Sequence, residues 1–145
     1  MLDLQEISDR IEIQDLLARY TQAIDQRDWD ALDRVFTPDA HIDYSAMGGA
    51  AGGLEEIKRF LAEAMPMFEV SQHLVGSSVV DIDGDTASAR TICHNPMVLR
   101  GGDDPHLLVC GLWYRDKLVR TPAGWRISER VEDRAYIKEE PPCPK

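Results

Sequence analysis

The chain has 145 residues, enough for one domain that buries roughly two thirds of the surface its unfolded chain exposes. Acidic residues outnumber basic ones by 26 to 16 and the basic ones never form a run, which excludes a surface that follows nucleic-acid phosphates. No apolar run approaches the roughly 18 residues of a membrane span, and the N-terminal MLDLQEISDR lacks the regions of a signal peptide, so we expect no membrane contact and a cytoplasmic location.

A long amphipathic helix is predicted at the N-terminus. Asp3 stands three residues before Glu6, a spacing typical of a helix cap in which side chains satisfy free backbone N–H groups. The helix is expected to end near Asp25. Its apolar stripe is made by side chains that recur at helical intervals: Leu4, Ile7, Ile11, Leu17 and Ile24, widened by Ile13, Leu16 and Tyr20.

Shorter elements are expected to follow. We predict a second helix at residues 29–36, stopped by Thr37-Pro38 because proline disfavours helical geometry in the residue before it. Alternating polarity predicts a short strand at residues 41–44, and the glycine-rich segment 48–53 predicts a flexible loop. A third helix is predicted at residues 54–67, where apolar side chains again gather on one side.

After Met67 the apolar pattern changes from helical spacing to strand alternation. Two turn signals, Asp83-Gly84 and residues 121–124, divide this half of the chain into hairpins. The predicted strands cover residues 70–82, 86–98, 107–119 and 125–137. Helices first and strands second indicate an α+β fold, in which a curved antiparallel sheet forms a cone and the helices close its internal cavity. We expect one domain at residues 1–140 and a loose proline-rich tail at residues 141–145.

Five polar side chains of reactive types are expected to point into this cavity. They are Tyr20, Asp25, Tyr44, His73 and His94. A buried polar group without a partner costs about 1–3 kcal/mol, so such a set implies that its members pair. The end of the first helix can bring the carboxylate of Asp25 against the imidazole of His73. That contact fixes the tautomer of the ring, stabilises its protonated form and makes it a base.

Four short motifs resemble one known family. They are YTQAID at residues 20–25, DWDAL at 28–32, FTPDA at 36–40 and QH at 72–73. Through these motifs, residues 4–138 resemble the SnoaL-like branch of the nuclear transport factor 2-like superfamily. The resemblance implies the same cone-shaped fold. It also implies a homo-oligomer, a trimer or a dimer, that assembles through the outer face of the sheet.

Within this branch the motifs are most similar to scytalone dehydratase, bile acid 7α-dehydratase and hexachlorocyclohexane dehydrochlorinase, in which an Asp–His pair removes a proton during elimination. The resemblance implies this role for Asp25 and His73. It further implies that Tyr44 and His94 act near the carbonyl and the leaving group. His94 precedes Asn95-Pro96, and proline within a strand indicates a bend or an edge position.

Together these residues predict a cofactor-independent dehydratase, a lyase acting on a hydrophobic cyclic or polycyclic hydroxy-carbonyl compound. His73 would remove the proton next to the carbonyl, with one ring nitrogen on Asp25 and the other turned toward open space. Tyr44, together with Tyr20, would donate a hydrogen bond to the developing enolate oxygen. His94 would protonate the departing hydroxyl.

Neither a cofactor nor a metal is expected. The sequence contains no glycine motif that cradles phosphates, and His41-Ile42-Asp43 is only a fragment of a metal site. The three cysteines are odd in number and widely spaced, which fits neither a disulfide framework nor a zinc motif: Cys93, Cys110 and Cys143.

Other interpretations of the same residues stay open. His73 also fits a core histidine with satisfied nitrogens, and Asp25 a helix cap. His41 and His106 are expected at the surface, and Arg130 is expected to be a solvated strand charge rather than a pair at the cavity mouth. The same catalytic base would also serve an isomerase or a polyketide cyclase. If the protein is not an enzyme, the alternative is a module that binds a hydrophobic ligand in the cavity.

Overall fold

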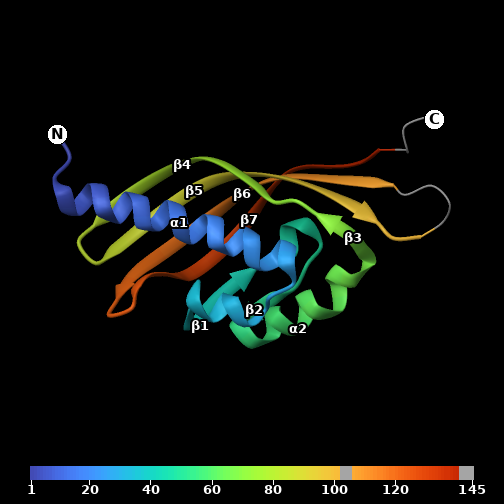
Figure 1. Ribbon diagram of the computed structural model, residues 1–145, viewed down its shortest axis with the longest axis horizontal. Coiled ribbons are helices and arrows are strands. Elements are labelled where there is room, and N and C mark those ends of the chain that lie inside the picture. Colours follow the sequence, from blue (N-terminus) through green and yellow to red (C-terminus); the bar gives the residue numbers. More distant parts are fainter. Residues whose placement is uncertain (102–105, 141–145) are drawn as a thin grey trace.

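The computed structural model describes residues 1–101 and 106–140, and at its centre is a bent sheet with helices against one face (Figure 1). The helices are α1 (Leu4–Gln26) and α2 (Leu54–Ala64), with short 3-10 turns η1 (Asp30–Arg34), η2 (Ser45–Met47) and η3 (Met65–Met67). The strands are β1 (Phe36–Asp43), β2 (Ala51–Gly53), β3 (Phe68–Ser71), β4 (Leu74–Asp83), β5 (Thr86–Leu99), β6 (Leu107–Thr121) and β7 (Gly124–Glu140).

The described sheet has seven strands in the order β2-β1-β7-β6-β5-β3, and β4 also pairs with β5. β1 runs parallel to β7, while the other described pairs are antiparallel. Gly84 and Gly124 adopt positive φ angles of 59° and 105°, which only glycine adopts readily, and close the two predicted hairpins. A mixed, curved sheet with N-terminal helices confirms the α+β class. The predicted tail lies outside the described residues.

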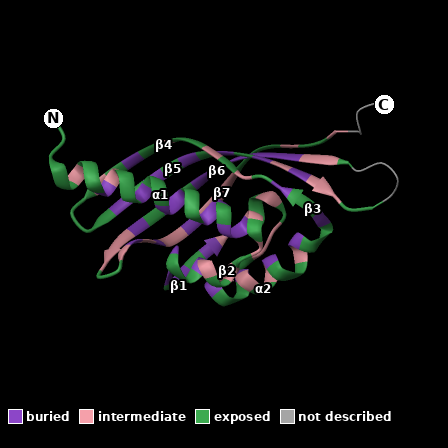
Figure 2. Cartoon of the chain, viewed as in Figure 1, coloured by how far each residue is buried: buried purple, intermediate pink, exposed green. Residues whose placement is uncertain are grey.

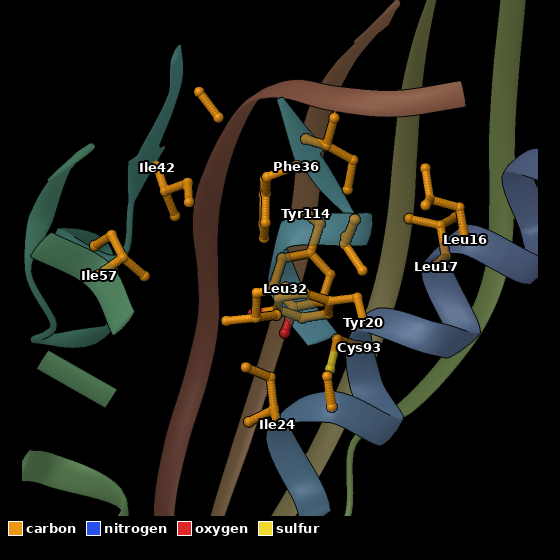
Figure 3. Packing of buried hydrophobic residues seen from close by; sticks show 14 of the residues in the cluster. Leu16, Leu17, Tyr20, Ile24, Leu32, Phe36, Ile42, Ile57, Cys93 and Tyr114 are labelled. Carbon is orange, nitrogen blue, oxygen red and sulfur yellow. The ribbon is translucent and has the colours of Figure 1, made fainter. Parts of the chain in front are cut away.

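α1 is the helix that carries the first predicted site residues. The carboxylate of Asp3 accepts the N–H of Glu6 at 2.8 Å, which confirms the predicted cap. The helix ends at Gln26, and the left-handed φ of 61° at the next residue, Arg27, turns the chain away. Within the described residues, no helix combines enough length with enough apolar character to cross a membrane. The inner face of α1 is buried against the sheet (Figure 2): Ile13, Leu16, Leu17, Tyr20 and Ile24. Figure 3 shows Leu16, Leu17, Tyr20 and Ile24 in the core.

The helix predicted at residues 29–36 is too long at its end, because the helical turn η1 stops at Arg34 and Phe36 already belongs to β1. The carbonyl of Val35 accepts the N–H of Ile127 at 2.9 Å, so pairing with β7 draws this segment into the sheet. Thr37 precedes a proline, and the extended geometry preferred there suits a strand as well as a helix stop. The glycine-rich loop is also shorter than predicted, because residues 51–53 pair with β1.

The strand predicted at residues 70–82 is interrupted where the site will lie. β3 ends at Ser71 and β4 begins at Leu74, and both pair with β5. Between them Gln72 donates its N–H to the carbonyl of Pro96 at 3.0 Å, while His73 stands outside the strand ladder. Because Gln72 uses its N–H for β5, the N–H of the next residue, His73, points away from β5 and is free for a side-chain partner.

Candidate active site

Asp25 and His73 are joined by two hydrogen bonds. The imidazole Nδ1 of His73 lies 2.6 Å from Oδ1 of Asp25, and the backbone N–H of His73 donates to Oδ2 at 2.8 Å. Asp25 comes from the last turn of α1, and His73 from the break between β3 and β4. The structure therefore brings the two predicted residues together, and Asp25 restrains both the ring and the backbone of His73.

Two more side chains support the carboxylate of Asp25. The hydroxyl of Ser71 donates to Oδ1 at 2.9 Å, and Nη1 of Arg27 donates to that hydroxyl at 2.8 Å. Burial acts to raise the pKa of Asp25, but the hydrogen bonds from the ring and N–H of His73 and from Ser71 outweigh it and lower the pKa. Asp25 is therefore an anion at neutral pH.

The hydrogen-bond partners define the tautomer of neutral His73. A carboxylate only accepts hydrogen bonds, so Nδ1 carries the hydrogen that faces Asp25 and Nε2 keeps a lone pair. The amide Nδ2 of Asn95 lies 3.0 Å from Nε2, in position to donate to it. The expectation that Nε2 faces open space is therefore corrected, because Nε2 shares its lone pair with Asn95.

His73 lies on the wall of a cavity of about 350 Å³. Its side chain is 8% exposed and that of Asp25 is 23% exposed, so the pair is largely shielded from solvent. Most of the wall is apolar, with contributions from Ile24, Phe60, Met65, Phe68, Met97 and Leu112. The polar side chains on this wall are few: Tyr20, Tyr44, His73, Asn95 and Glu132.

Tyr20 and Tyr44 line the cavity as the sequence predicted, and their hydroxyl oxygens are 2.6 Å apart. Burial raises the pKa of Tyr20 to about 12, against the opposing charge of Arg130, and raises the pKa of Tyr44 well above its usual range. Both phenols are thus neutral at pH 7. In a hydrogen-bonded pair of hydroxyls only one hydrogen lies between the oxygens, so one donor remains for a ligand.

Arg130 is fully buried, so the expectation that it is a solvated strand charge is wrong. Its guanidinium lies against the rings of both Tyr20 and Tyr114, at 4.1 and 4.0 Å from their centroids. It also forms two hydrogen bonds of 2.7 Å to the carboxylate of Asp116. Figure 3 shows Tyr20 and Tyr114 together in the core. Arg130 therefore fixes the ring of Tyr20, and with it the direction of its hydroxyl.

Glu132 is a cavity residue that sequence reasoning missed. It follows Arg130 by two residues on β7 and lines the cavity. Burial raises its pKa from 4.5 to about 8, against the opposing charge of Arg130 and with a further contribution from Asp43. A bulge in β7 between Ile127 and Glu129 moves the inward positions from odd to even numbers, so simple alternation does not reveal Glu132.

His94 does not join this group. Its side chain is exposed on the other face of the sheet, where Nδ1 lies 3.2 Å from the hydroxyl of Tyr136. The expectation that His94 points into the cavity is wrong, because Asn95 takes the inward position of β5 next to His73. The difference is one residue, which in a strand exchanges the two faces.

In the described part of the chain, the remaining histidines do not line the cavity, and burial raises the pKa of both described thiols, of which Cys110 lines it. His41 and His106 are exposed, as expected. Burial raises the pKa of the Cys93 thiol to about 11, so it is protonated at neutral pH. Among residues 1–101 and 106–140, no three His, Cys, Asp or Glu side chains are grouped closely enough to hold a metal ion.

Comparison with known sequences gives one family. Residues 5–131 match the SnoaL-like domain. An uncharacterized protein of Mycobacterium tuberculosis is 56% identical over 138 residues, which cover 95% of this chain and 93% of the relative. An uncharacterized protein of Mycobacterium bovis matches to the same extent.

Comparison with solved structures gives the same fold. A candidate aromatic ring hydroxylase from Novosphingobium aromaticivorans is 30% identical, with a TM-score of 0.83 over 92% of this chain and 94% of that one. The hexachlorocyclohexane dehydrochlorinase of Novosphingobium barchaimii is 18% identical, with a TM-score of 0.82 over 96% and 94%. A nuclear transport factor 2-like protein of Salmonella enterica is 19% identical, with a TM-score of 0.76 over 89% and 92%.

Proposed function

Because this chain belongs to the SnoaL-like family of the nuclear transport factor 2-like superfamily, we propose that its cavity is the active site of a cofactor-independent lyase. The proposed reaction is a dehydration of a hydrophobic cyclic or polycyclic hydroxy-carbonyl compound. One observation carries the proposal: the 2.6 Å contact between Asp25 and His73 on the wall of an apolar cavity. The names of the structural relatives describe different reactions, so we base the proposal on this geometry.

In this proposal His73 is the general base. Its Nε2 takes the proton from the carbon next to the carbonyl, and the Asp25 carboxylate stabilises the imidazolium that forms. General base catalysis of this kind contributes about 10²–10⁴-fold to the rate. The approaching C–H bond replaces the amide of Asn95 at Nε2. That amide has a second acceptor nearby, the sulfur of Met97 at 3.6 Å from Nδ2.

The two tyrosines stabilise the enolate oxygen. One hydrogen of the Tyr20–Tyr44 pair is free for a ligand, and both phenols are neutral at pH 7 because burial raises their pKa values. A donor aimed at a developing oxyanion contributes about 10²–10³-fold to the rate. The guanidinium of Arg130 packs on the ring of Tyr20, so the donor is oriented before the substrate binds.

The cavity supports the substrate class. Its volume of about 350 Å³ is at the lower end of small-molecule sites, and its wall is mainly apolar with few polar groups. Such a space suits a compact ring system that carries a carbonyl and a hydroxyl. A strongly charged substrate would lose its hydration there without gaining a charged partner.

The proposal is tested with a β-hydroxydecalone, a two-ring hydroxyketone, by following the absorbance of the conjugated enone that dehydration forms. His73→Ala should lower the rate by about 10²–10⁴-fold while circular dichroism and thermal unfolding stay those of the parent. If His73→Ala forms the enone at the parent rate, the enzymatic proposal fails and a module that binds hydrophobic ligands replaces it. An isomer formed in place of the enone would instead indicate an isomerase that uses the same base.

A further inference from the structure

A second group able to carry a proton faces the same cavity from another strand. Glu132 lies on β7, opposite Tyr114 of β6, and Tyr114 is in turn opposite Thr91 of β5. Asn95, beside His73, lies farther along β5. The backbones of β5 and β7 are two strand spacings apart, about 9–10 Å. Glu132 and the His73 ring therefore border the cavity on different sides, with room for a ring system between them.

The carboxyl of Glu132 is unpaired within the part of the chain that the structure describes, residues 1–101 and 106–140. The nearest cation on its own strand, Arg130, directs Nε and Nη2 to Asp116 rather than to Glu132. An unpaired carboxyl inside an apolar wall is stable only in its neutral form. Its free O–H is then available to a ligand in the cavity.

The groups around Glu132 favour that neutral form. Two charges act on it: Arg130, which is already balanced by Asp116, and Asp43, which opposes ionisation of a second carboxyl. Burial is the largest cause and raises its pKa to about 8. The other titratable groups that face Glu132 have pKa values raised by burial and are neutral at pH 7: Tyr20, Tyr44, Tyr114, Cys93 and Cys110.

We propose that Glu132 is the general acid of the elimination, the catalytic residue that protonates the departing hydroxyl. This inference rests on the proposed function. His73 takes the proton from the α-carbon, the electron pair of that C–H bond forms the C=C bond, the C–O bond breaks, and the hydroxyl takes the proton of Glu132 and leaves as water. The imidazolium then returns a proton to the Glu132 carboxylate through solvent, which restores both groups.

Leaving-group dependence tests this role. The probes are the β-hydroxydecalone and its acetate ester, because acetate leaves as a stable anion and needs no proton. Glu132→Gln keeps the shape of the side chain but transfers no proton, so the rate on the hydroxyl probe should fall by about 10²–10⁴-fold while the acetate probe reacts at nearly the parent rate. The matched control is Glu129→Gln on the same strand, whose carboxylate pairs with Lys117 at 3.1 Å. This control should leave both rates unchanged.

The parent protein supplies a readout that does not depend on any variant folding. Because Glu132 must be protonated, the rate on the hydroxyl probe should fall as pH rises through about 8, and the rate on the acetate probe should not. Two results with Glu132→Gln would overturn the inference: an equal loss of rate on both probes, or unchanged rates on both. In the parent, an equal fall of the rate at alkaline pH with both leaving groups would overturn it as well.

Failure of this inference is distinguishable from failure of the proposed function. Plain decalone has no leaving group and reports only removal of the α-proton, as deuterium uptake from heavy water. If the parent exchanges this proton and Glu132→Gln still dehydrates the hydroxyl probe normally, Glu132 is not the acid while His73 remains the base. If the parent neither exchanges decalone nor converts the other two probes, the proposed function itself is contradicted.

Discussion

Asp25 holds His73 at two atoms, since Oδ1 faces the ring Nδ1 at 2.6 Å and Oδ2 accepts the backbone N–H at 2.8 Å. The backbone contact is possible because β3 and β4 pair only with β5 among the described strands, and Gln72 uses its N–H for β5, so the N–H of the next residue, His73, points away from that strand. The carboxylate of Asp25 thus places the ring and fixes its tautomer at the same time. A base oriented in this way needs little reorganisation when a substrate binds.

The Asp25–His73 contact should also make stability depend on pH. The folded state lowers the pKa of Asp25 below its ordinary value of 3.8, so the carboxylate contributes stability above that value and loses it as pH falls through the folded pKa. The parent should therefore exceed Asp25→Asn in unfolding free energy by more at pH 7 than at pH 3. Urea denaturation at the two pH values measures this difference. A difference that does not change with pH would show that the charge of Asp25 contributes nothing.

Glu132 should give a pH dependence of the opposite sign. Its pKa rises from 4.5 to about 8 on folding, so the native state holds a proton that the unfolded chain has lost between these values. The parent should lose stability relative to Glu132→Gln as pH rises from about 4.5 to 8. Thermal unfolding of both proteins across this range measures the effect. Parallel curves would mean that Glu132 ionises normally in the folded protein.

The two tyrosines should substitute for each other in part. Tyr44→Phe leaves the hydroxyl of Tyr20 in the cavity, and the reverse holds for Tyr20→Phe, so each single change should have a mild effect on dehydration of the β-hydroxydecalone. The double variant removes every donor of the pair and should lower the rate by about 10²–10³-fold. Steady-state kinetics on the three proteins tests this. A double variant no slower than the singles would assign stabilisation of the enolate to other groups.

Breaking the buried ion pair between Arg130 and Asp116 should destabilise the fold. Arg130→Met leaves the carboxylate of Asp116 buried and unpaired, which should cost about 3–5 kcal/mol of unfolding free energy. The double change Arg130→Met with Asp116→Leu should recover much of the loss, because no buried charge then remains. Arg134→Met, at an exposed position of the same strand, is the control and should stay within about 0.5 kcal/mol of the parent. Equal stability of Arg130→Met and this control in urea denaturation would contradict the interpretation.

The outer face of the sheet should mediate assembly. Val79 and Ile92 are 68% and 47% exposed there, and apolar side chains exposed together on one face are candidates for an interface. We predict a homo-oligomer, a trimer ahead of a dimer, and dissociation by Ile92→Lys. Light scattering at micromolar concentration measures the mass. A monomer mass for the parent would refute this prediction.

Much of the site could be predicted because its residues occur in local motifs. Asp25 at the end of an amphipathic helix and His73 after a strand are both visible in sequence, and so is the helix cap at Asp3. The inward position of Asn95, rather than His94, follows from β5 itself, where the odd-numbered residues from Ala87 to Met97 are buried without interruption. The exposed Ile92 hides this alternation in the sequence, because an isoleucine looks like a core residue. The break between β3 and β4 was not visible either, because a local pattern does not contain the contact of this segment with α1.

The buried charges could not be predicted for a similar reason. Arg130 and Glu132 lie on a strand with several exposed charges, and the bulge in β7 moves them to the inner face. The partner of Arg130, Asp116, is 14 residues away on the neighbouring strand, so its pairing depends on register. Pairing of β1 with β7 likewise turned the predicted end of a helix at Phe36 into the start of a strand.

Exchange of the α-proton of decalone in heavy water, followed by NMR, tests the central claim most directly, because it reports removal of a proton by His73 without any leaving group. The parent should exchange this proton, His73→Ala should lower the exchange rate by about 10²–10⁴-fold, and His94→Ala, which changes a histidine on the outer face, should exchange like the parent. Exchange by His73→Ala at the parent rate would contradict the assignment of His73 as the catalytic base.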